Sequence, residues 1–140
     1  MEYEIKEIKT EQELKNVLEI CYRILGGEDS ELYCYSAWER RLEDGLQPLV
    51  YAVKDGIILS CVLGRAENKD SLVIGFVACE EDFRGKGITK ALMGYFGNRA
   101  REMGYKYITL GSKADGFYDS CGYKVIFEIN GQNIYQKLLD

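Results

Sequence analysis

Apolar residues recur at helical spacing in the N-terminal part of the chain. Residues Thr10–Glu13, "TEQE", have the Ser/Thr-x-x-Glu form of a helix-capping box, and a helix is expected to follow until Gly26 and Gly27. A second helix is predicted from about Glu31 to Asp44, just before Gly45. One face of this second helix is predicted to carry Leu32, Tyr35, Trp38 and Leu42.

The pattern changes to extended runs from Leu49 onward. Three apolar runs lie between positions 49 and 79, separated by Asp55-Gly56 and by the polar residues 67–70. An Asp-Gly pair between apolar runs is a strong hairpin signal. These runs are therefore predicted to form consecutive antiparallel strands.

The C-terminal part combines one further helix pattern with short strands. A helix is expected from about Gly87 to Met103, and its Gly94 and Gly97 suggest close packing or approach by another backbone. Residues 105–110, "YKYITL", are predicted to form a strand, and a short segment then leads to two final strands joined through Asn130-Gly131. The predicted order is strand, two helices, three strands, helix, strand, short helix and two strands, which is an α/β (α+β) architecture.

Length and composition fit one globular domain over residues 1–140, because the chain has 140 residues of which 46% are hydrophobic. No apolar run approaches the roughly 18 residues of a membrane span, and the start "MEYEIKEIKT" does not resemble a signal peptide. A soluble cytoplasmic protein is expected. The five cysteines include no Cys-x-x-Cys pair, so reduced thiols are the simplest interpretation.

The chain contains no histidine and carries a formal net charge of −5. Without an imidazole, Ser-His-Asp and Cys-His activation of a nucleophile are excluded, and no metal site is expected. Proton transfer has to use Glu, Asp, Tyr, Cys, Lys or water. The acidic balance argues against a nucleic-acid partner and suits a cationic amine better than an anion.

Two glycines separate an apolar strand from the next helix, in Arg84-Gly85-Lys86-Gly87-Ile88-Thr89. A turn without Cβ atoms can point backbone N–H groups at an anion, and the helix N-terminus adds positive charge, so this turn is a candidate phosphate cradle. A plain tight turn is the alternative. The segment fits neither a P-loop nor a dinucleotide fingerprint, because it lacks the further glycines that those motifs need.

This segment resembles motif A of the GNAT acetyltransferases, an Arg/Gln-x-x-Gly-x-Gly/Ala turn after the fourth strand. Thr89 replaces the final Gly or Ala and offers a hydroxyl donor. Residues Ala114 to Tyr123, which read "AxxFYxxxGY", resemble motif B of the same family, and both motifs occur within a matching order of elements. The resemblance implies the GNAT fold, with a mixed central sheet of about six or seven strands flanked by about four helices.

The resemblance also implies the cofactor and the reaction. In GNAT enzymes such a turn holds the pyrophosphate of acetyl-CoA, which maps onto the backbone of Arg84, Gly85, Lys86, Gly87, Ile88 and Thr89. The preceding strand splays from its neighbour and pairs with the pantetheine arm, at Val77 and Cys79, and its N–H groups polarise the thioester carbonyl. Direct acetyl transfer to an amine is implied, without a metal.

Candidate acid and base residues follow from the same resemblance. Tyr118 matches the tyrosine that often protonates the departing CoA thiolate; alternatively it only packs a short helix on the sheet. The chain lacks the glutamates that relatives carry near position 71 or on the fifth strand, and also their asparagine after that strand. Glu80 is the candidate general base, with a solvated loop as the alternative. Cys61 and Cys121 are interpreted as core residues.

The aromatic stretch 31–41, "ELYCYSAWERR", is expected to border the acceptor pocket. Tyr33 and Glu39 are candidates for contact with the acceptor, whereas Tyr35 and Trp38 have core spacing. The sequence predicts an N-acetyltransferase acting on a primary amine of a small molecule or peptide. The alternative is a GNAT-like module that binds acyl-CoA without efficient catalysis, and exposed sheet edges allow a homodimer.

Overall fold

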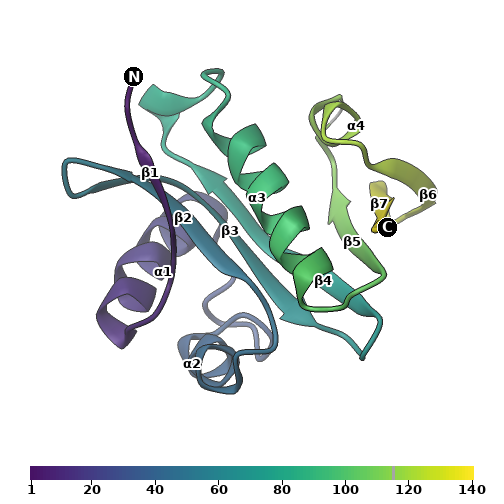
Figure 1. Ribbon diagram of the computed structural model, residues 1–140, viewed down its shortest axis with the longest axis horizontal. Coiled ribbons are helices and arrows are strands. Elements are labelled where there is room, and N and C mark those ends of the chain that lie inside the picture. Colours follow the sequence, from purple (N-terminus) through teal and green to yellow (C-terminus); the bar gives the residue numbers. More distant parts are fainter. Residues whose placement is uncertain (115) are drawn as a thin grey trace.

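The computed structural model describes residues 1–114 and 116–140; Asp115, which falls within the second motif, lies outside the described residues. The elements follow the predicted order, with one turn of 3-10 helix added after the fourth strand (Figure 1). The strands are β1 (Glu4–Glu7), β2 (Leu49–Lys54), β3 (Ile57–Ala66), β4 (Ser71–Cys79), β5 (Tyr107–Ser112), β6 (Lys124–Ile129) and β7 (Gln132–Leu138). The helices are α1 (Glu11–Leu25), α2 (Tyr35–Asp44), α3 (Ile88–Glu102) and α4 (Phe117–Ser120), and the 3-10 turn is η1 (Glu81–Phe83).

The seven strands form one mixed sheet in the order β1-β2-β3-β4-β5-β7-β6. β4 and β5 run parallel, because α3 carries the chain back between them, and the other neighbouring strands are antiparallel. The predicted α/β class, with a mixed sheet and flanking helices, is confirmed.

Both predicted hairpin turns have the backbone that their residues favour. Asp55 and Gly56 have φ values of 50° and 78°, and Asn130 and Gly131 have φ values of 53° and 75°. Two consecutive positive φ angles characterise the type I′ turn, whose twist matches that of the flanking strands. These local signals were therefore sufficient to place the β2–β3 and β6–β7 hairpins.

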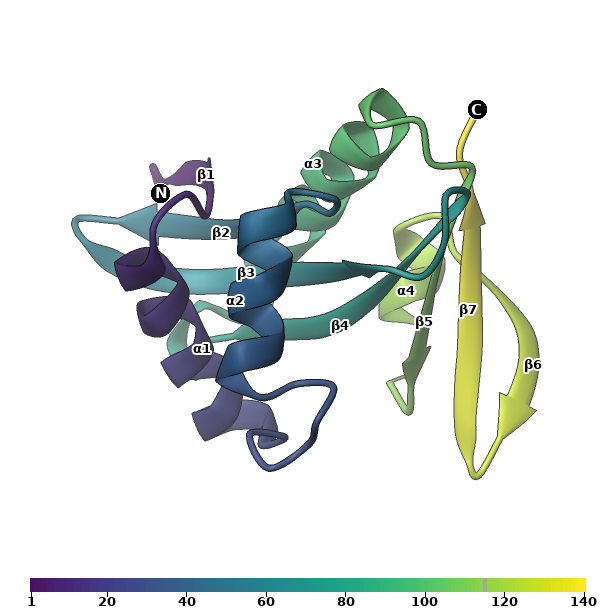
Figure 2. The same ribbon diagram turned by 90° about the horizontal axis from the view of Figure 1, so that it is seen from below.

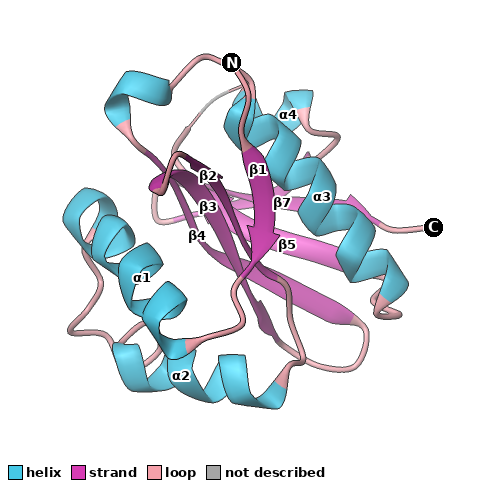
Figure 3. Ribbon diagram, turned by 60° about the vertical axis from the view of Figure 1, so that its left-hand side comes forward, coloured by secondary structure: helices cyan, strands magenta, loops and turns pink. Residues whose placement is uncertain are grey.

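Helices cover the two faces of the sheet and create two hydrophobic cores (Figures 2 and 3). α1 and α2 lie on one face, where Leu14, Leu18 and Trp38 pack on strand residues that include Phe76. α3 lies on the other face, where its buried residues pack with those of the central strands and α4. The predicted capping box begins α1, since the Thr10 hydroxyl accepts a hydrogen bond from the Glu13 N–H at 3.1 Å.

The second helix begins later than predicted, at Tyr35 instead of Glu31. Two side chains bind carbonyl oxygens of the preceding loop: Tyr22 Oη donates to the Tyr33 oxygen and Arg41 Nη1 to the Leu32 oxygen, both at 2.8 Å. These contacts hold residues before Tyr35 in turns. Leu32 therefore does not join the buried face and is 41% exposed, while Trp38 is fully buried as predicted.

The close packing predicted at the two helix glycines is absent at exposed Gly94, and Gly97 is buried without a tight contact at its Cβ position. A Cβ built on Gly94 meets nothing within 4 Å, and one built on Gly97 meets only Lys137 Nζ at 3.9 Å. The close approach is at Gly64 in β3, where a Cβ would lie 2.5 Å from Phe96 Cζ of α3. The glycine that permits close packing is thus Gly64 in the sheet. Because it has no Cβ, the Phe96 ring of α3 can lie against β3.

Replacing Gly64 by alanine is expected to lower the free energy of unfolding by about 1–3 kcal/mol, because Phe96 is fully buried and has to leave its rotamer. Urea unfolding followed by circular dichroism measures the change. Gly94→Ala is the matched control, and it is expected to raise stability by up to about 1 kcal/mol, since its Cβ would enter open space in a helix. Equal stability of Gly64→Ala and the wild type would contradict the packing argument.

The far edge of the sheet is formed by β6, all six residues of which are exposed. Its pairing with β7 is interrupted between Val125 and Phe127, and such a bulge twists an edge strand out of a regular ladder. Among the described residues, no helix has the length and apolar character needed to cross a membrane.

Candidate active site

The sheet splits between its two parallel strands. β4 pairs with β5 only from Ser71 to Val73, opposite Tyr107 to Thr109, and β4 then continues to Cys79. Figure 2 shows β5, β7 and β6 turning away from β4. On the other side of β4, Leu63 pairs with Phe76 and Gly64 with Ile74, so Gly75 is an extra residue that bulges and twists the strand.

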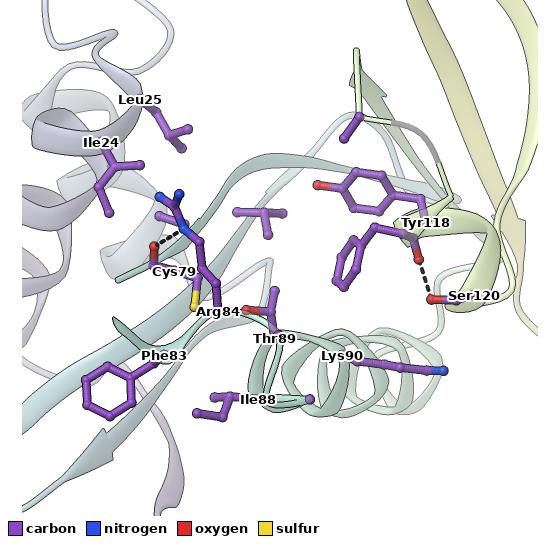
Figure 4. Close-up of a pocket in the computed structure, with 16 residues that line it drawn as sticks. Ile24, Leu25, Cys79, Phe83, Arg84, Ile88, Thr89, Lys90, Tyr118 and Ser120 are labelled. Atoms are coloured by element: carbon purple, nitrogen blue, oxygen red, sulfur yellow. Dashed lines mark hydrogen bonds between the residues drawn. The ribbon is translucent and has the colours of Figure 1, made fainter. Parts of the chain in front are cut away.

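A cavity of about 560 Å³ lies at this split (Figure 4). Its walls come from the end of α1, the last residues of β4, the glycine turn with the start of α3, and α4. It contains most of the residues predicted to hold the cofactor: Val77, Cys79, Arg84, Gly85, Gly87, Ile88 and Thr89, and Tyr118 lines the opposite wall. Parts of the chain that are distant in sequence thus enclose one space.

The glycine turn has the backbone that an anion cradle needs. Gly85 and Gly87 have φ values of 74° and 82°, in the left-handed region that other residues adopt at a cost. A Cβ at either position would meet nothing within 4 Å, so backbone conformation and not crowding accounts for the glycines. Gly87 precedes α3 without a side-chain cap, which leaves the first N–H groups of this helix available to a ligand.

The Thr89 hydroxyl is engaged inside the protein. It lies 2.8 Å from the hydroxyl oxygen of Ser60, which is itself fully buried and donates to the Ala78 carbonyl oxygen at 2.9 Å. Because the single hydroxyl hydrogen of Ser60 is used on that carbonyl, Thr89 has to donate to Ser60. The Thr89 hydroxyl, which the sequence suggested as an additional hydrogen-bond donor in the turn, instead links α3 to β3.

The two cations of the turn differ in position. Arg84 lies in the cavity wall, where its Nε donates to the Cys79 carbonyl oxygen at 3.2 Å (Figure 4). This bond fixes the turn against the end of β4. Lys86 is exposed and does not line the cavity, so its positive charge acts from outside the cavity.

Tyr118 is both a packing residue and a cavity residue. Its ring lies 5.4 Å from that of Tyr135 and 6.3 Å from that of Tyr123, between centroids, and the residue is only 7% exposed. Figure 4 shows its hydroxyl directed into the cavity. Burial raises the pKa of Tyr118 to about 12, so the phenol keeps its proton at neutral pH.

Cys61 and Cys121, both interpreted from the sequence as core residues, are buried to different degrees. Cys61 is fully buried, with its sulfur 3.4 Å from that of Cys21. Cys121 is partly buried against the core on the α3 side, and burial raises the pKa of its thiol. Neither thiol lines the cavity.

The candidate base and acceptor residues lie outside this lining. Glu80 forms an ion pair with Arg23 of α1, at 2.7 Å between Oε2 and Nη2. Tyr33 packs in an aromatic cluster, 5.1 Å from Phe76 between ring centroids. Glu39 lies on α2 near Glu11, and a hydrogen bond between these two carboxyl groups raises the pKa of Glu39. The tertiary structure does not bring these three side chains to the cavity.

Several lining residues were not predicted from the sequence. Phe83 and Lys90 directly flank the glycine turn, so their spacing from it was a usable signal. Ile24 and Leu25 come from the end of α1 and carried no signal, because their place depends on how α1 packs on β4. Phe117 and Ser120 accompany Tyr118 on α4.

Comparisons with known proteins agree with this geometry. The sequence model described as Acetyltransferase (GNAT) family matches residues 11–123, and the chain therefore belongs to this family. No curated protein matches the sequence. The relationship of this chain to known proteins is therefore seen in the family model and in the fold.

Solved structures share the fold at low sequence identity. The PaiA N-acetyltransferase from Thermoplasma acidophilum, in complex with coenzyme A, has a TM-score of 0.80 at 16% identity, with 99% of each chain covered. An aminoglycoside 6'-N-acetyltransferase complexed with coenzyme A has a TM-score of 0.79 at 14% identity, with 96% of each chain covered. N-acetylglutamate synthase from Neisseria gonorrhoeae has a TM-score of 0.76 at 14% identity, over 100% of this chain and 36% of that one.

Proposed function

We propose that residues 1–140 form one acetyl-CoA-dependent N-acetyltransferase domain, which transfers an acetyl group to a primary amine of a small molecule or peptide. The observation that carries this proposal is the cavity in the β4–β5 split, which has the glycine turn at one wall and the Tyr118 hydroxyl at another. Membership of the GNAT family and the coenzyme A bound by proteins of the same fold support it.

The residues present fit coenzyme A as a ligand. Backbone N–H groups of residues 84–89 and the start of α3 would hold the pyrophosphate, with Arg84 and Lys86 adding positive charge. Beyond Val73, β4 has no strand partner on the β5 side among the described residues, so its backbone at Val77 and Cys79 would pair with the pantetheine arm. Bound acetyl-CoA supplies an activated acyl group, so no metal is required.

Tyr118 would act as the general acid toward the leaving sulfur. Its raised pKa keeps it in the acid form, and its position at the split places the proton inside the cavity. For Glu80 to act as the base, its carboxylate has to leave Arg23 and reach the cavity, so the ion pair argues against this role.

Isothermal titration of acetyl-CoA, CoA and ATP into the reduced protein tests the cofactor assignment. We expect micromolar binding of both CoA species and no comparable binding of ATP, since the cavity lined by the turn also includes Val77 and Cys79 of the unpaired part of β4, where a pantetheine arm would find backbone partners. A lack of CoA binding would mean that the glycines serve the fold alone. Stronger binding of ATP would favour a nucleotide-binding regulator.

One observation favours the second candidate, an acyl-CoA-binding module without efficient catalysis. The described residues that line the cavity include no carboxylate that could act as a general base. Release of CoA thiol in the presence of amines separates the two candidates. Thiol release above the rate of spontaneous hydrolysis supports the transferase, and CoA binding without release supports the module.

A further inference from the structure

A fully buried serine connects two walls of the cavity from behind. Ser60 lies in β3 and is not among the described residues that line the cavity. Its hydroxyl donates to the Ala78 carbonyl oxygen at 2.9 Å and accepts from the Thr89 hydroxyl at 2.8 Å. Ala78 and Thr89 both line the cavity (Figure 4), so one side chain links the β4 wall to the α3 wall.

Packing alone does not account for a hydroxyl at this position. A buried polar group costs free energy unless it is hydrogen-bonded, and a small apolar residue in β3 would avoid that cost. Ser60 offsets the cost by making two hydrogen bonds, and each bond goes to a different element of the fold. The hydroxyl therefore contributes a linkage between β3, β4 and α3.

The bond to Ala78 holds β4 in the orientation that exposes its free backbone groups. The Glu80 N–H donates to the Leu59 carbonyl oxygen at 2.9 Å, so the backbone groups of Ala78 and Glu80 point toward β3. Successive residues of a strand point these groups to opposite sides. Val77 and Cys79 therefore present their N–H and C=O groups toward the split, where the pantetheine arm would pair.

The bond to Thr89 anchors the first turn of α3. Thr89 is the second residue of this helix, and Gly87 before it supplies no side-chain cap. Gly85 and Gly87 also give the preceding turn more backbone freedom than other residues would. The bond from Thr89 to Ser60 thus provides an anchor that the cap residue lacks, at the helix end whose N–H groups would face the pyrophosphate.

We propose that Ser60 is a positioning residue of the cofactor site, which holds the start of α3 at a fixed place beside β4. This inference rests on the proposed binding of acetyl-CoA and names a residue that acts on that binding without touching the ligand. The pyrophosphate at α3 and the pantetheine arm on β4 belong to one molecule, so both contacts form only where the spacing of the two elements matches it. A preset spacing removes an ordering cost from binding.

Ser60→Ala is expected to raise the Kd of acetyl-CoA at least about fivefold in isothermal titration, because the variant loses the link while the groups that would contact the ligand remain. In thiol release, the increase in KM for acetyl-CoA is expected to exceed any decrease in kcat by a similar factor. Ser71→Ala is the matched control, since Ser71 is also buried in the sheet, at 3% exposure, and does not line the cavity. Equal Kd values for the two folded variants would overturn the proposal.

A pair of substitutions at Thr89 tests the link from its other end. Thr89→Val keeps the branched shape and removes the hydroxyl, whereas Thr89→Ser keeps the hydroxyl. The Kd of acetyl-CoA is expected to be at least about fivefold higher for Thr89→Val than for Thr89→Ser. Thr89 is only partly buried, so this comparison serves even where Ser60→Ala does not fold. The same Kd for both Thr89 variants would contradict the link.

The double variant Ser60→Ala, Thr89→Val separates the link from a direct contact between the Thr89 hydroxyl and the phosphate. Two hydroxyls that act through each other are lost together, so the Kd of the double variant is expected to lie within about twofold of that of Ser60→Ala. A direct contact gives a different result, because Ser60→Ala then releases the Thr89 hydroxyl to the phosphate. Unchanged or tighter binding by Ser60→Ala, or additive losses in the double variant, would refute the positioning role.

Titration of the wild-type protein distinguishes failure of this inference from failure of the proposed function. A wild-type protein that does not bind acetyl-CoA contradicts the proposed function and overturns this inference with it. Wild-type binding that is unaffected by Ser60→Ala and by Thr89→Val overturns this inference alone. Wild-type binding that both variants weaken, with Ser71→Ala and Thr89→Ser binding more tightly than they do, supports both.

Discussion

Replacement of Gly87 by aspartate is expected to abolish detectable binding of acetyl-CoA and CoA. Gly87 has a φ of 82° and directly precedes α3, so its backbone lies where the proposed pyrophosphate would meet the helix N-terminus. A Cβ there enters open space, so the new carboxylate does not enter the core and stays beside the N–H groups of the proposed cradle. Repulsion of the diphosphate and loss of the accessible N–H groups both weaken binding.

Gly87→Asn separates charge from backbone strain. Asn and Asp have similar size and both tolerate the left-handed region better than most residues, so the two variants share the strain of about 1–2 kcal/mol at most. Calorimetric titration of CoA is expected to show weakened but measurable binding for Gly87→Asn and none for Gly87→Asp. Wild-type affinity in folded Gly87→Asp would remove the turn from the binding site.

Replacement of Tyr118 by phenylalanine is expected to lower kcat at least about tenfold, with little change in acetyl-CoA affinity. The ring keeps its packing against Tyr123 and Tyr135, so the variant loses the phenol proton and not the fold. Because burial raises the pKa of Tyr118 to about 12, the wild-type acid is present throughout the neutral and mildly alkaline range. Any loss of wild-type rate at pH 8 or 9 would then come from another group.

Tyr123→Phe is the matched control for the loss of a phenol. Tyr123 is 3% exposed and does not line the cavity, and its hydroxyl has no hydrogen-bond partner within residues 1–114 and 116–140. Its removal is expected to leave kcat unchanged. Stopped-flow or steady-state thiol release compares the variants, and wild-type turnover by Tyr118→Phe would exclude the proposed acid role.

Local chemistry explains why much of the fold was predictable. The capping box at Thr10, the Asp-Gly and Asn-Gly turns and the glycine turn each depend on the conformation of a few neighbouring residues. Such signals survive in a single sequence because they need no distant contact. They are sufficient to predict the order of elements and the likeness of residues 84–89 to a cofactor turn, because neither feature requires information on packing.

One prediction that depended on distant contacts was wrong, and the role of Glu80 stays a prediction. The start of α2 is set by hydrogen bonds from Tyr22 and Arg41 to the preceding loop, and neither bond follows from helical spacing. Glu80 follows β4 directly, yet Arg23 of α1 pairs with it. A residue's place in the chain therefore did not establish whether its side chain reached the cavity.

The sequence by itself determined the GNAT resemblance and the glycine turn, because turn backbone and cap chemistry are properties of short segments. Only the tertiary structure decided which side chains share a cavity. The split between β4 and β5 depends on a bulge at Gly75 and on pairing that ends at Val73, and α1 delivers Leu25 to that split. Packing of segments far apart in the chain therefore sets a mainly apolar lining beside Tyr118, while the described lining includes none of the 23 acidic residues that give the chain its net negative charge.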